Sequence, residues 1–402
     1  MSREGCDKEV RSSGEIPRPV DEEYSKDVET VKESILGTYN RAMLQISEAL
    51  EGGSAHGLEI PRLDEFKRRY KRCIKVGQGG FGEVYIVFDN VKGVYLTMKR
   101  VQLFYKPGSA HNTLSRPTLR EVILLKQIDH RNIVKLIDYH VMPDGMFIML
   151  MPVIPFDLIS LIRIWRHKGP RGEASVGRMP LPTTKCIFRQ ILMGVDYLHK
   201  QRIIHRDLKP SNIMIDDNGV VKIIDFGWAR SVPRTITGKL TGPPCIISYR
   251  PPEVLLGKNG ARHYDLSVDI WSIACILFEM LSGGKPFNSA RSEVEAMTAI
   301  TNVLGSPSNG STLYYGSDNN DSNKPQRNQP SNLSSRCKMM NIDRDSVSFL
   351  KEMLRWEPKD RLTASELLEH RWFNTPPLPC RPEEISLPVN NTYRFLEPKR
   401  SR

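Results

Sequence analysis

The stretch His205-Arg206-Asp207-Leu208-Lys209-Pro210-Ser211-Asn212, followed shortly by Asp225-Phe226-Gly227, decides how the rest of the sequence is interpreted. The carboxylate of Asp207 suits the acceptance of a proton from a hydroxyl group. Asn212 and Asp225 offer the oxygen ligands that Mg²⁺ prefers, and because this ion keeps several waters, two short side chains are enough to hold it beside phosphate groups. An ordinary polar loop is the alternative, but two ordered motifs in this succession favour a catalytic site.

The composition is that of a globular protein. The chain has 402 residues, of which 39% are hydrophobic and 26% charged, and no apolar run approaches the ~18 residues of a membrane span. The seven cysteines include no Cys-x-x-Cys pair, so neither a zinc site nor a disulfide framework is indicated. The N-terminus has no apolar signal core. We therefore expect an intracellular chain that is long enough for a two-lobed unit with tails.

The chain is basic, with a formal charge of +12 at pH 7 and a pI near 9.3. Such a charge favours acidic partners, which include acidic or phosphorylated proteins and nucleic acids. A solvated basic surface is the simpler alternative. The sequence shows neither an aromatic-interleaved RNA-binding motif nor zinc-finger spacing, and this argues against direct nucleic-acid binding.

Two segments precede the first glycine-rich motif. Residues 1–20 are polar, contain glycine and proline, and are expected to be a disordered tail. Residues 21–66 are expected to be a helical extension, because apolar side chains recur every three or four positions between Val28 and Leu50. The apolar stripe of this helix must be covered, and we favour packing on the chain's own globular part over docking of a partner.

The glycine-rich motif is Gly77-Gln78-Gly79-Gly80-Phe81-Gly82-Glu83-Val84. Dinucleotide-binding folds also use Gly-x-Gly-x-x-Gly, but there a helix follows the glycines. Residues 84–88 are rich in β-branched and aromatic side chains and predict a strand instead. We therefore expect a hairpin that covers phosphate groups, in which Gly77, Gly79 and Gly82 let the backbone approach the ligand closely.

Over roughly residues 70–375 these motifs resemble those of the eukaryotic protein kinases. Lys209, two residues after the aspartate of the first motif, is similar to the serine/threonine-specific members. Thr118-Leu119-Arg120-Glu121 and Arg250 resemble the cyclin-dependent kinase family. The glycine motif and Tyr249-Arg250-Pro251-Pro252-Glu253, with its double proline, resemble the transcription-elongation branch of that family.

The resemblance implies an α+β, two-lobed protein kinase fold. A small lobe of antiparallel sheet with one regulatory helix is expected over residues 70–154, and a larger, mostly helical lobe over residues 155–375. Serine, asparagine, glycine and proline dominate residues 305–341, which predicts a flexible insertion. A C-terminal tail is expected over residues 376–402.

The same resemblance implies that the chain uses ATP and Mg²⁺ to phosphorylate serine or threonine hydroxyls of protein substrates. The implied catalytic residues are Asp207, Lys209, Asn212, Lys99 and Glu121. Asp207 would receive the hydroxyl proton, and Lys99, held by Glu121, would bind the α- and β-phosphates. Asn212 and Asp225 are the implied metal ligands.

Seventeen positions are implied to surround the nucleotide. They are Val76, Gly77, Gln78, Gly79, Gly80, Phe81, Gly82, Glu83, Val84, Thr97, Lys99, Met151, Pro152, Ile154, Asp157, Met214 and Ile224. Thr97 replaces the usual alanine and would narrow the adenine pocket, whereas Met151 would control access to its back. The backbone of Pro152 and Ile154 would hydrogen-bond the base, because a proline carbonyl can still accept.

Three of these positions have a structural alternative. Asp157 would meet the ribose hydroxyls, or it would cap the N-terminus of a helix. Met214 and Ile224 would form the floor of the adenine pocket, or they would be plain core residues.

Two charged contacts are expected to organise the large lobe. Glu253 and Arg361 would form a buried ion pair, which is costly to break from one side. Asp269 would tie the catalytic-loop backbone to a central helix.

The segment Ile246-Ile247-Ser248 replaces the threonine and tryptophan that are usual in relatives, so the substrate-facing platform is expected to be altered.

Three arginines would converge in such a fold, namely Arg120, Arg206 and Arg230. A phosphate on a threonine of residues 234–241 would bind all three and order the loop. Counting back from Tyr249 selects Thr241, whereas the local Arg-Thr-x-Thr pattern selects Thr237, and we favour Thr241. Arginines that are solvated or paired with nearby carboxylates are the alternative.

The expected partners are a cyclin-type subunit, an activating kinase and protein substrates of transcription or cell-cycle control, with the nucleus favoured over the cytoplasm. Gly80 and Phe81 replace the threonine and tyrosine used for inhibitory phosphorylation in cell-cycle members, so the chain should escape that control. The alternatives are a pseudokinase or scaffold, and a neighbouring kinase that needs no cyclin. An active enzyme is favoured by a complete set of Lys99, Glu121, Asp207, Asn212 and Asp225.

Overall fold

The computed structural model describes residues between 63 and 387, with gaps at 80–81, 103, 106–111, 114–115, 143–145, 168–177, 233–239, 242–245, 257–260, 263–264, 288–290, 309–310, 312–324 and 326–327. The predicted tail 1–20 and the predicted helix between Val28 and Leu50 lie outside these residues, as do Gly80, Phe81 and Thr237. No helix among the described residues has the length and apolar character needed to span a membrane.

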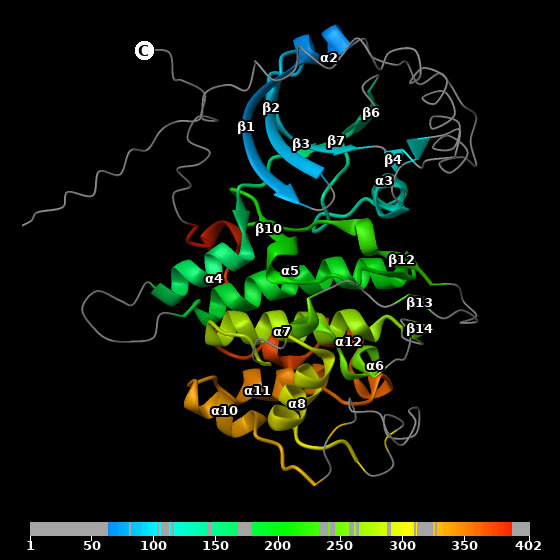
Figure 1. Ribbon diagram of the computed structural model, residues 1–402. Coiled ribbons are helices and arrows are strands. Elements are labelled where there is room, and N and C mark those ends of the chain that lie inside the picture. The colour runs from blue at the N-terminus through cyan, green and yellow to red at the C-terminus, as the bar shows by residue number, and fades with distance from the viewer. Residues whose placement is uncertain are drawn as a thin grey trace, which may run out of the picture.

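A five-stranded antiparallel sheet in the order β1-β2-β3-β7-β6 forms the small lobe (Figure 1). Its strands are β1 (Tyr70–Gly79), β2 (Gly82–Asp89), β3 (Val94–Gln102), β7 (Met146–Pro152) and β6 (Asp138–Val141). Side chains alternate between the faces of a strand, and each face of this sheet carries its own buried cluster. Other elements of the chain must therefore pack against both faces of the sheet.

Helix α3 (Arg116–Gln127) covers one face of the sheet. Its Val122 is fully buried among Val101, Phe147 and Met149. The two-stranded ribbon of β4 (Phe104–Tyr105) and β5 (Asn112–Thr113) lies between β3 and this helix in the chain. The small lobe thus has the antiparallel sheet predicted from the sequence, and α3 is the helix that was predicted beside it.

The short helix α2 (Leu63–Arg69) covers the other face, and its first residues fall within the helical extension predicted over residues 21–66. Phe66 is buried against Tyr70 at the start of β1. The Arg69 guanidinium lies 3.2 Å from the fully buried carboxylate of Asp89. Burial acts to raise the pKa of Asp89, but hydrogen bonds from Arg69 and from two backbone N–H groups outweigh it and hold this pKa below its ordinary value.

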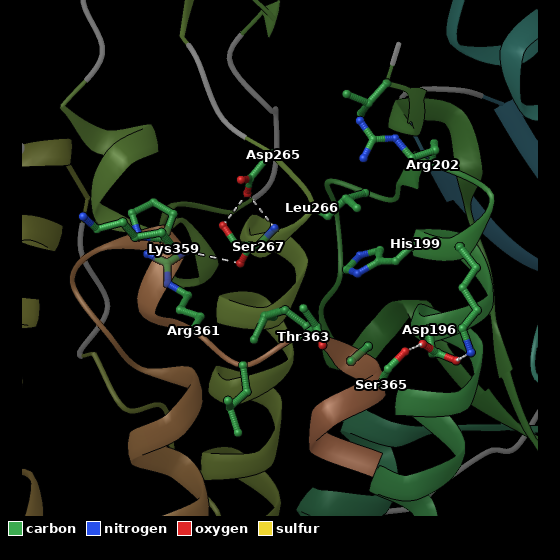
Figure 2. A pocket seen from close by; sticks show the side chains of 16 residues that line it. Asp196, His199, Arg202, Asp265, Leu266, Ser267, Lys359, Arg361, Thr363 and Ser365 are labelled. Atoms are coloured by element: carbon green, nitrogen blue, oxygen red, sulfur yellow. Dashed lines mark hydrogen bonds and ion pairs between the residues drawn. The ribbon is translucent and has the colours of Figure 1, made fainter. Parts of the chain in front are cut away.

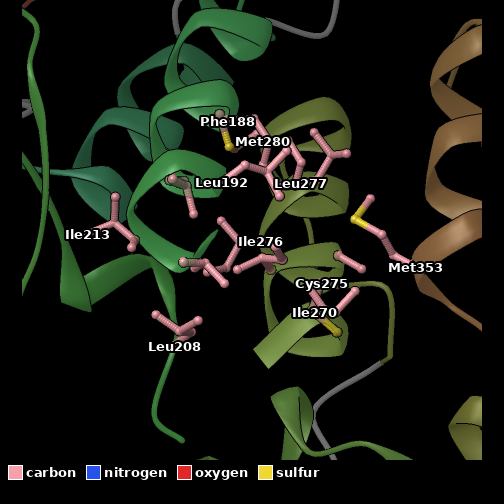
Figure 3. Close-up of a cluster of buried hydrophobic side chains, with 14 of the residues drawn as sticks. Phe188, Leu192, Leu208, Ile213, Ile270, Cys275, Ile276, Leu277, Met280 and Met353 are labelled. Carbon is pink, nitrogen blue, oxygen red and sulfur yellow. The ribbon is translucent and has the colours of Figure 1, made fainter. Parts of the chain in front are cut away.

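The large lobe is built around two helices, α5 (Leu181–Lys200) and α7 (Ser267–Ser282). Every residue of α7 from Val268 to Leu281 is buried, as expected of a helix that is apolar on all sides and lies inside a lobe. Figure 3 shows Ile270 and Ile276 of α7 facing α5, while Met353 approaches α7 from its other side. This core fixes the floor on which the predicted catalytic loop lies.

Further helices and short strands surround these two helices (Figure 1). The helices are α4 (Leu158–His167), α6 (Pro252–Leu255), α8 (Glu293–Leu304), α10 (Leu333–Met339), α11 (Arg344–Met353) and α12 (Ala364–Leu368). The strand pairs are β8 (Phe156–Asp157) and β11 (Val221–Ile223) on either side of β10 (Ile213–Ile215), β9 (Ile203–Ile204) with β12 (Arg230–Ser231), and β13 (Leu240–Thr241) with β14 (Ala261–Arg262). The 3-10 helices are η1 (Pro210–Asn212), η2 (Phe226–Trp228), η3 (Ile247–Tyr249), η5 (Pro358–Asp360), η6 (Arg371–Phe373) and η7 (Pro382–Glu384). The predicted two-lobed α+β fold is confirmed.

The prediction of an unfolded insertion over residues 305–341 is wrong for its last part. Helix α10 lies there, and its Leu333 and Cys337 are 2% and 0% exposed. The two residues are four positions apart and share one helix face, so two side chains are enough to anchor a segment that is otherwise polar. The average composition of the segment concealed this local pattern.

The predicted C-terminal tail also begins with packed structure. Ile385 is 6% exposed and belongs to the large-lobe core. The ammonium group of Lys185 donates to the carbonyl of Thr375 at 2.7 Å, and the Cys380 N–H donates to the carbonyl of Pro182 at 3.2 Å. Residues 376–387 therefore pack on the large lobe.

The expected ion pair between Glu253 and Arg361 is present. Two guanidinium nitrogens of Arg361 donate to the two carboxylate oxygens of Glu253, each at 2.7 Å, and the side chains are 0% and 8% exposed. Arg361 also donates to the carbonyls of Arg355 and Ser267, so the pair joins α6, α7 and the segment after α11.

Replacement of Arg361 by methionine should lower the free energy of unfolding by about 3–5 kcal/mol, because it leaves the Glu253 carboxylate buried without its partner. Arg355→Met is the matched control, since the pair of Arg355 with Glu352 is largely exposed and should cost only about 0–1 kcal/mol. Urea unfolding followed by circular dichroism measures both. Equal losses in the two variants would contradict the importance of the buried pair.

Candidate active site

The loop 205–212 lies between β9 and β10 and is fixed from below by Asp269 of α7. One carboxylate oxygen of Asp269 accepts the N–H of His205 at 2.8 Å, and the other accepts the N–H of Arg206 at 2.9 Å. The His199 ring nitrogen Nε2 lies 3.1 Å from the same carboxylate. Burial acts to raise the pKa of Asp269, but these hydrogen bonds and the histidines outweigh it and lower the pKa. The predicted tie between the loop and a central helix is present.

The backbone of Arg206 has a left-handed conformation, with φ of +71°. Such a conformation costs free energy in a residue with a side chain and persists only where its surroundings impose it. Here the hydrogen bond from the Arg206 N–H to Asp269 imposes it, and the following residue, Asp207, is turned as a result.

Both polar neighbours of Asp207 bind the same carboxylate oxygen. The Lys209 ammonium donates to Oδ2 at 2.7 Å, and the Asn212 amide donates to Oδ2 at 3.0 Å and to the Asp207 carbonyl at 2.8 Å. The other oxygen, Oδ1, is buried and has no hydrogen-bond partner within the described part of the chain. Asp207 therefore presents one fixed oxygen and one available acceptor.

His205 joins the two motifs that were quoted first. Its Nε2 lies 3.0 Å from the carbonyl of Ile224, which accepts the hydrogen bond, and its Nδ1 accepts the N–H of Asp207 at 3.3 Å. Its ring packs edge-on against Phe226, with the centroids 4.8 Å apart. The sequence assigned no role to His205, although it begins the motif, because only the folded chain shows that its ring bridges the two loops.

Asp225 begins η2 in a left-handed conformation, with φ of +66°. Its Oδ1 lies 3.7 Å from the ammonium nitrogen of Lys99 and accepts no hydrogen bond from the described residues. Asp225 belongs to the large lobe and Lys99 to β3 of the small lobe, so this contact spans the two lobes.

The predicted contact between Lys99 and Glu121 is also present. The ammonium group donates to both carboxylate oxygens, at 3.0 and 2.7 Å, and both side chains are largely buried. Burial acts to lower the pKa of Lys99, but the carboxylates of Glu121 and Asp225 outweigh this effect and raise it. The positive charge of Lys99 is therefore retained at neutral pH.

The glycine-rich motif forms the predicted hairpin of β1 and β2, in which Gly79 pairs with Gly82. The backbone of Gly82 has φ of +134°, and a Cβ atom there would overlap the carbonyl of Arg100 on β3. Glycine at this position is thus required by the neighbouring strand, in addition to any approach of a ligand.

Two residues of the motif brace the hairpin. Glu83 accepts a hydrogen bond from the Lys75 ammonium at 2.6 Å, and the Gln78 side chain accepts one from the same group at 3.0 Å. The hydrogen bond from Lys75 lowers the pKa of Glu83. Val76, between Lys75 and Gly77, is 38% exposed, and Val84 is half-buried.

The predicted adenine-binding residues lie at the end of β7. Thr97 of β3 is paired with Met151 of β7, and both are half-buried. Pro152 is the last residue of β7, and Ile154 beyond it is 8% exposed.

Asp157 caps the N-terminus of helix α4, which was the alternative predicted for it. Its carboxylate accepts the N–H of Ser160, in the first turn of α4, at 2.8 Å. The capping role is thus present, and the ribose contact stays a prediction. Met214 and Ile224 are half-buried and packed against the large-lobe core, which agrees with the core alternative for both.

The described residues place the regulatory candidates only in part. Arg206 is 3% exposed, and Arg230 of β12 is paired with Ile204, two residues before Arg206. Thr241 is paired with Ala261 of β14. The side chains of Thr241 and Arg120 lie outside the described residues, so the convergence on a phosphate stays a prediction.

The polar atoms left over at this site suit a hard divalent cation. The Oδ1 atom of Asp225 is a buried acceptor that receives no hydrogen bond from the described residues, and the amide nitrogen of Asn212 is held by Asp207, which leaves the amide oxygen for another partner. No cluster of three or more His, Cys, Asp or Glu side chains that could hold a metal occurs among the described residues. Phosphate oxygens and waters would have to complete the coordination, as is usual for Mg²⁺.

A separate cavity of about 450 Å³ lies in the large lobe, between the end of α5, the start of α7 and the segment around η5 (Figure 2). His199, Arg202, Ser267 and Lys359 are among its lining residues, and none of the predicted site residues lines it. The contact of His199 with Asp269 connects it to the active site.

The two lobes, the glycine hairpin and the groups around Asp207 together define a protein kinase domain, and the model of the family "Protein kinase domain" matches residues 70–373. The chain is 34% identical over 314 residues to cell division control protein 2 homolog 3 of Trypanosoma brucei brucei. The match covers 77% of this chain and 93% of that protein. The chain thus belongs to the protein kinase family.

Two further relatives are named as cyclin-dependent kinases. The chain is 29% identical over 336 residues to cyclin-dependent kinase C-2 of Oryza sativa subsp. japonica and 31% identical over 336 residues to probable cyclin-dependent kinase 9 of Schizosaccharomyces pombe. Each match covers 79% of this chain, but only 61% and 54% of the two relatives. Together with the family match, these relatives show a serine/threonine kinase of the cyclin-dependent type, which confirms the resemblance drawn from the sequence motifs.

Replacement of Asp269 by asparagine should lower the free energy of unfolding by about 2–4 kcal/mol at pH 7, because an amide N–H₂ would face the N–H groups of the loop. The folded pKa of Asp269 lies below its unfolded value, so its stabilisation is present above the unfolded pKa and is lost as the pH falls through the folded pKa. The difference from wild type should therefore be constant down to about pH 5 and shrink only below it.

Urea unfolding of both proteins between pH 7 and pH 4 tests this. Asp265→Asn, an exposed change at the start of the same helix, serves as the control and should alter stability by less than about 0.5 kcal/mol. A difference for Asp269→Asn that already halves between pH 7 and pH 5 would contradict the lowered pKa.

Proposed function

We propose that the chain is an ATP- and Mg²⁺-dependent kinase that is activated by a cyclin-type subunit and phosphorylates serine or threonine residues of proteins in transcription or cell-cycle control. The observation that carries the proposal is the arrangement of Asp207. Its Oδ2 is held by Lys209 and Asn212, while its Oδ1 is a buried acceptor that the described residues leave without a hydrogen bond.

Asp207 acts on the substrate hydroxyl. Oδ1 accepts the hydrogen bond of the hydroxyl and so orients its oxygen for attack on the γ-phosphorus of ATP. As this bond forms, the bond from the γ-phosphorus to the bridging oxygen breaks, ADP leaves, and the hydroxyl proton passes to the carboxylate. The Lys209 ammonium lies 2.7 Å from Oδ2 and so fixes the orientation of the carboxylate plane. Phosphoryl transfer needs little other covalent chemistry from the protein, so orientation is the main contribution.

The nucleotide is held from both lobes. Lys99 binds the α- and β-phosphates, and Glu121 positions its ammonium group through two hydrogen bonds. Asn212 and Asp225 hold the Mg²⁺ ion, which when bound neutralises phosphate charge. Thr97 and Met151, paired across β3 and β7, frame the adenine together with the backbone of Pro152 and Ile154.

The proposal of a cyclin-type subunit and an activating kinase is supported by the names of the relatives and by the sequence of helix α3. Two of the matched proteins are named as cyclin-dependent kinases, and α3 carries Thr118-Leu119-Arg120-Glu121, with Glu121 at the active site. A subunit that binds α3 would control the distance between Glu121 and Lys99. The nucleus is the proposed location, in keeping with a role in transcription.

Two isosteric variants separate chemistry from metal binding. Asp207→Asn should lower kcat by about 10²–10⁴-fold and leave nucleotide affinity almost unchanged, because Asp207 acts on the hydroxyl. Asp225→Asn should instead remove the strengthening of ATP binding by Mg²⁺, because it loses a charged ligand. Phosphate transfer to a general serine/threonine substrate, with a cyclin bound, and fluorescence titrations of nucleotide with and without Mg²⁺ measure the two effects. Wild-type turnover by Asp207→Asn would refute its role.

Phosphorylation of Thr241 should switch the enzyme on. Three arginines around a phosphate give charge-assisted hydrogen bonds that order the loop, so Thr241→Ala should lower kcat by about 5–150-fold, the range of a typical coupling between sites. Mass spectrometry of the active enzyme identifies the modified residue, and Thr237→Ala is assayed beside it. Full activity of the double variant, with the partner saturating, would show that no such switch exists.

A further inference from the structure

The packed C-terminal segment contacts the first turns of α5. The carbonyl of Pro182 accepts the N–H of Cys380 at 3.2 Å, and Lys185 holds the carbonyl of Thr375. The nearby Ile385 is buried in the large-lobe core. These contacts fix the segment on both sides of Cys380.

Cys186 lies on the same face of α5 as the carbonyl that binds Cys380. It follows Pro182 by four positions, and residues that are four apart lie one above the other on a helix. The Cys380 thiol lies close enough to the Cys186 thiol to contribute, after burial, to the raised pKa of Cys186. Both are free thiols, Cys186 being 5% exposed and Cys380 half-buried.

The next turn of α5 supplies a third contact. Gln190 donates from its amide nitrogen to the Cys186 sulfur at 3.7 Å and to the carbonyl of Gly219 at 3.1 Å. A Cβ atom on Gly219 would overlap the carbonyl of Pro382, so this glycine and the C-terminal segment are in direct contact. Contacts at three successive turns of α5 thus hold Cys380 over Cys186.

We propose that Cys186 and Cys380 are a site of reversible oxidation, at which a hydroperoxide converts the two thiols into a disulfide that fastens the C-terminal segment to α5. The proposal does not depend on the kinase reaction. The structure binds the Cys380 backbone to α5 one helical turn before Cys186, and the segment that carries Cys380 is held by the contacts described above.

The two thiols are oxidised by hydrogen peroxide in two steps. The more exposed Cys380 thiolate attacks an oxygen of hydrogen peroxide, the O–O bond breaks, and the departing hydroxide becomes water, which leaves a sulfenic acid. The Cys186 sulfur then attacks the Cys380 sulfur, the S–O bond breaks, and the leaving hydroxide takes the Cys186 proton as a second water. Two thiols are oxidised by two electrons, and one peroxide is reduced to two waters.

The order of these steps follows from burial. Burial raises the pKa of the Cys186 thiol to about 12, so this thiol stays protonated and does not react first with the oxidant. Its proton is lost only in the second step. The amide N–H of Gln190, donated to the Cys186 sulfur, supports the negative charge that develops there, which makes Gln190 a positioning residue.

The site is connected to the junction of the lobes. The side-chain oxygen of Gln190 accepts hydrogen bonds from the Asn132 amide at 3.2 Å and from the N–H of Val221 at 3.0 Å. Asn132 precedes β6 of the small lobe, and Val221 begins β11, which leads to Asp225. The disulfide would therefore form beside an amide that holds the two lobes together.

The test uses the full-length chain, treated with hydrogen peroxide, alkylated and mapped by mass spectrometry without reduction. A peptide that links Cys186 to Cys380 should appear, disappear after dithiothreitol, and be absent from Cys380→Ser and from Cys186→Ala. Cys73→Ser, an exposed change on β1, is the control and should leave the linked peptide unchanged. Cleavage by protease within residues 376–387 should be slowed severalfold in the oxidised wild type but not in Cys380→Ser.

Other outcomes would overturn the proposal. These are oxidation of Cys380 only to a sulfinic acid, a disulfide that joins either residue to a different cysteine, or equal proteolysis of the oxidised and reduced forms. Because Cys380 is only half-buried, Cys380→Ser is expected to fold, and its circular dichroism spectrum and melting temperature confirm this before oxidation is compared.

Discussion

The carboxylate of Asp269 is the group on which the geometry of the active site depends. It lies inside a helix that is buried along nearly its whole length, so its position is fixed by the packing of the large lobe. From there it binds two successive backbone N–H groups of the catalytic loop and so maintains the left-handed turn at Arg206. Asp207 and His205 then take the orientations that connect them to Lys209, Asn212 and the Asp225 motif. The hydrophobic core thus determines, through one buried charge, where the catalytic oxygen points.

Much of the fold and site could be predicted because short motifs specify local chemistry. The β-branched residues after the glycines distinguished a hairpin from a dinucleotide site, and the contacts of Lys99 with Glu121 and of Arg361 with Glu253 followed from the order of the motifs. Such contacts join residues that are distant in the chain, and composition or periodicity alone would not have paired them. The resemblance to kinases supplied that information.

The features that could not be predicted from the sequence depend on packing between segments that carry no motif. Cys380 and Pro182 are joined by a backbone hydrogen bond, which any residue can make, so side-chain identity gives no sign of it. Asp157 was open between two roles because a carboxylate before a helix suits both a cap and a ligand, and only the folded chain shows the capping hydrogen bond with Ser160. The helix α10 was missed because two buried side chains are too few to change the composition of a polar segment.

The distance of 3.7 Å between Lys99 and Asp225 has a mechanical meaning, because the two residues belong to different lobes. Their attraction varies inversely with distance, so it opposes any rotation that separates the lobes. Lys99 is largely buried, and salt screens buried charges only weakly. The contact therefore favours the closed arrangement of the two lobes at physiological ionic strength.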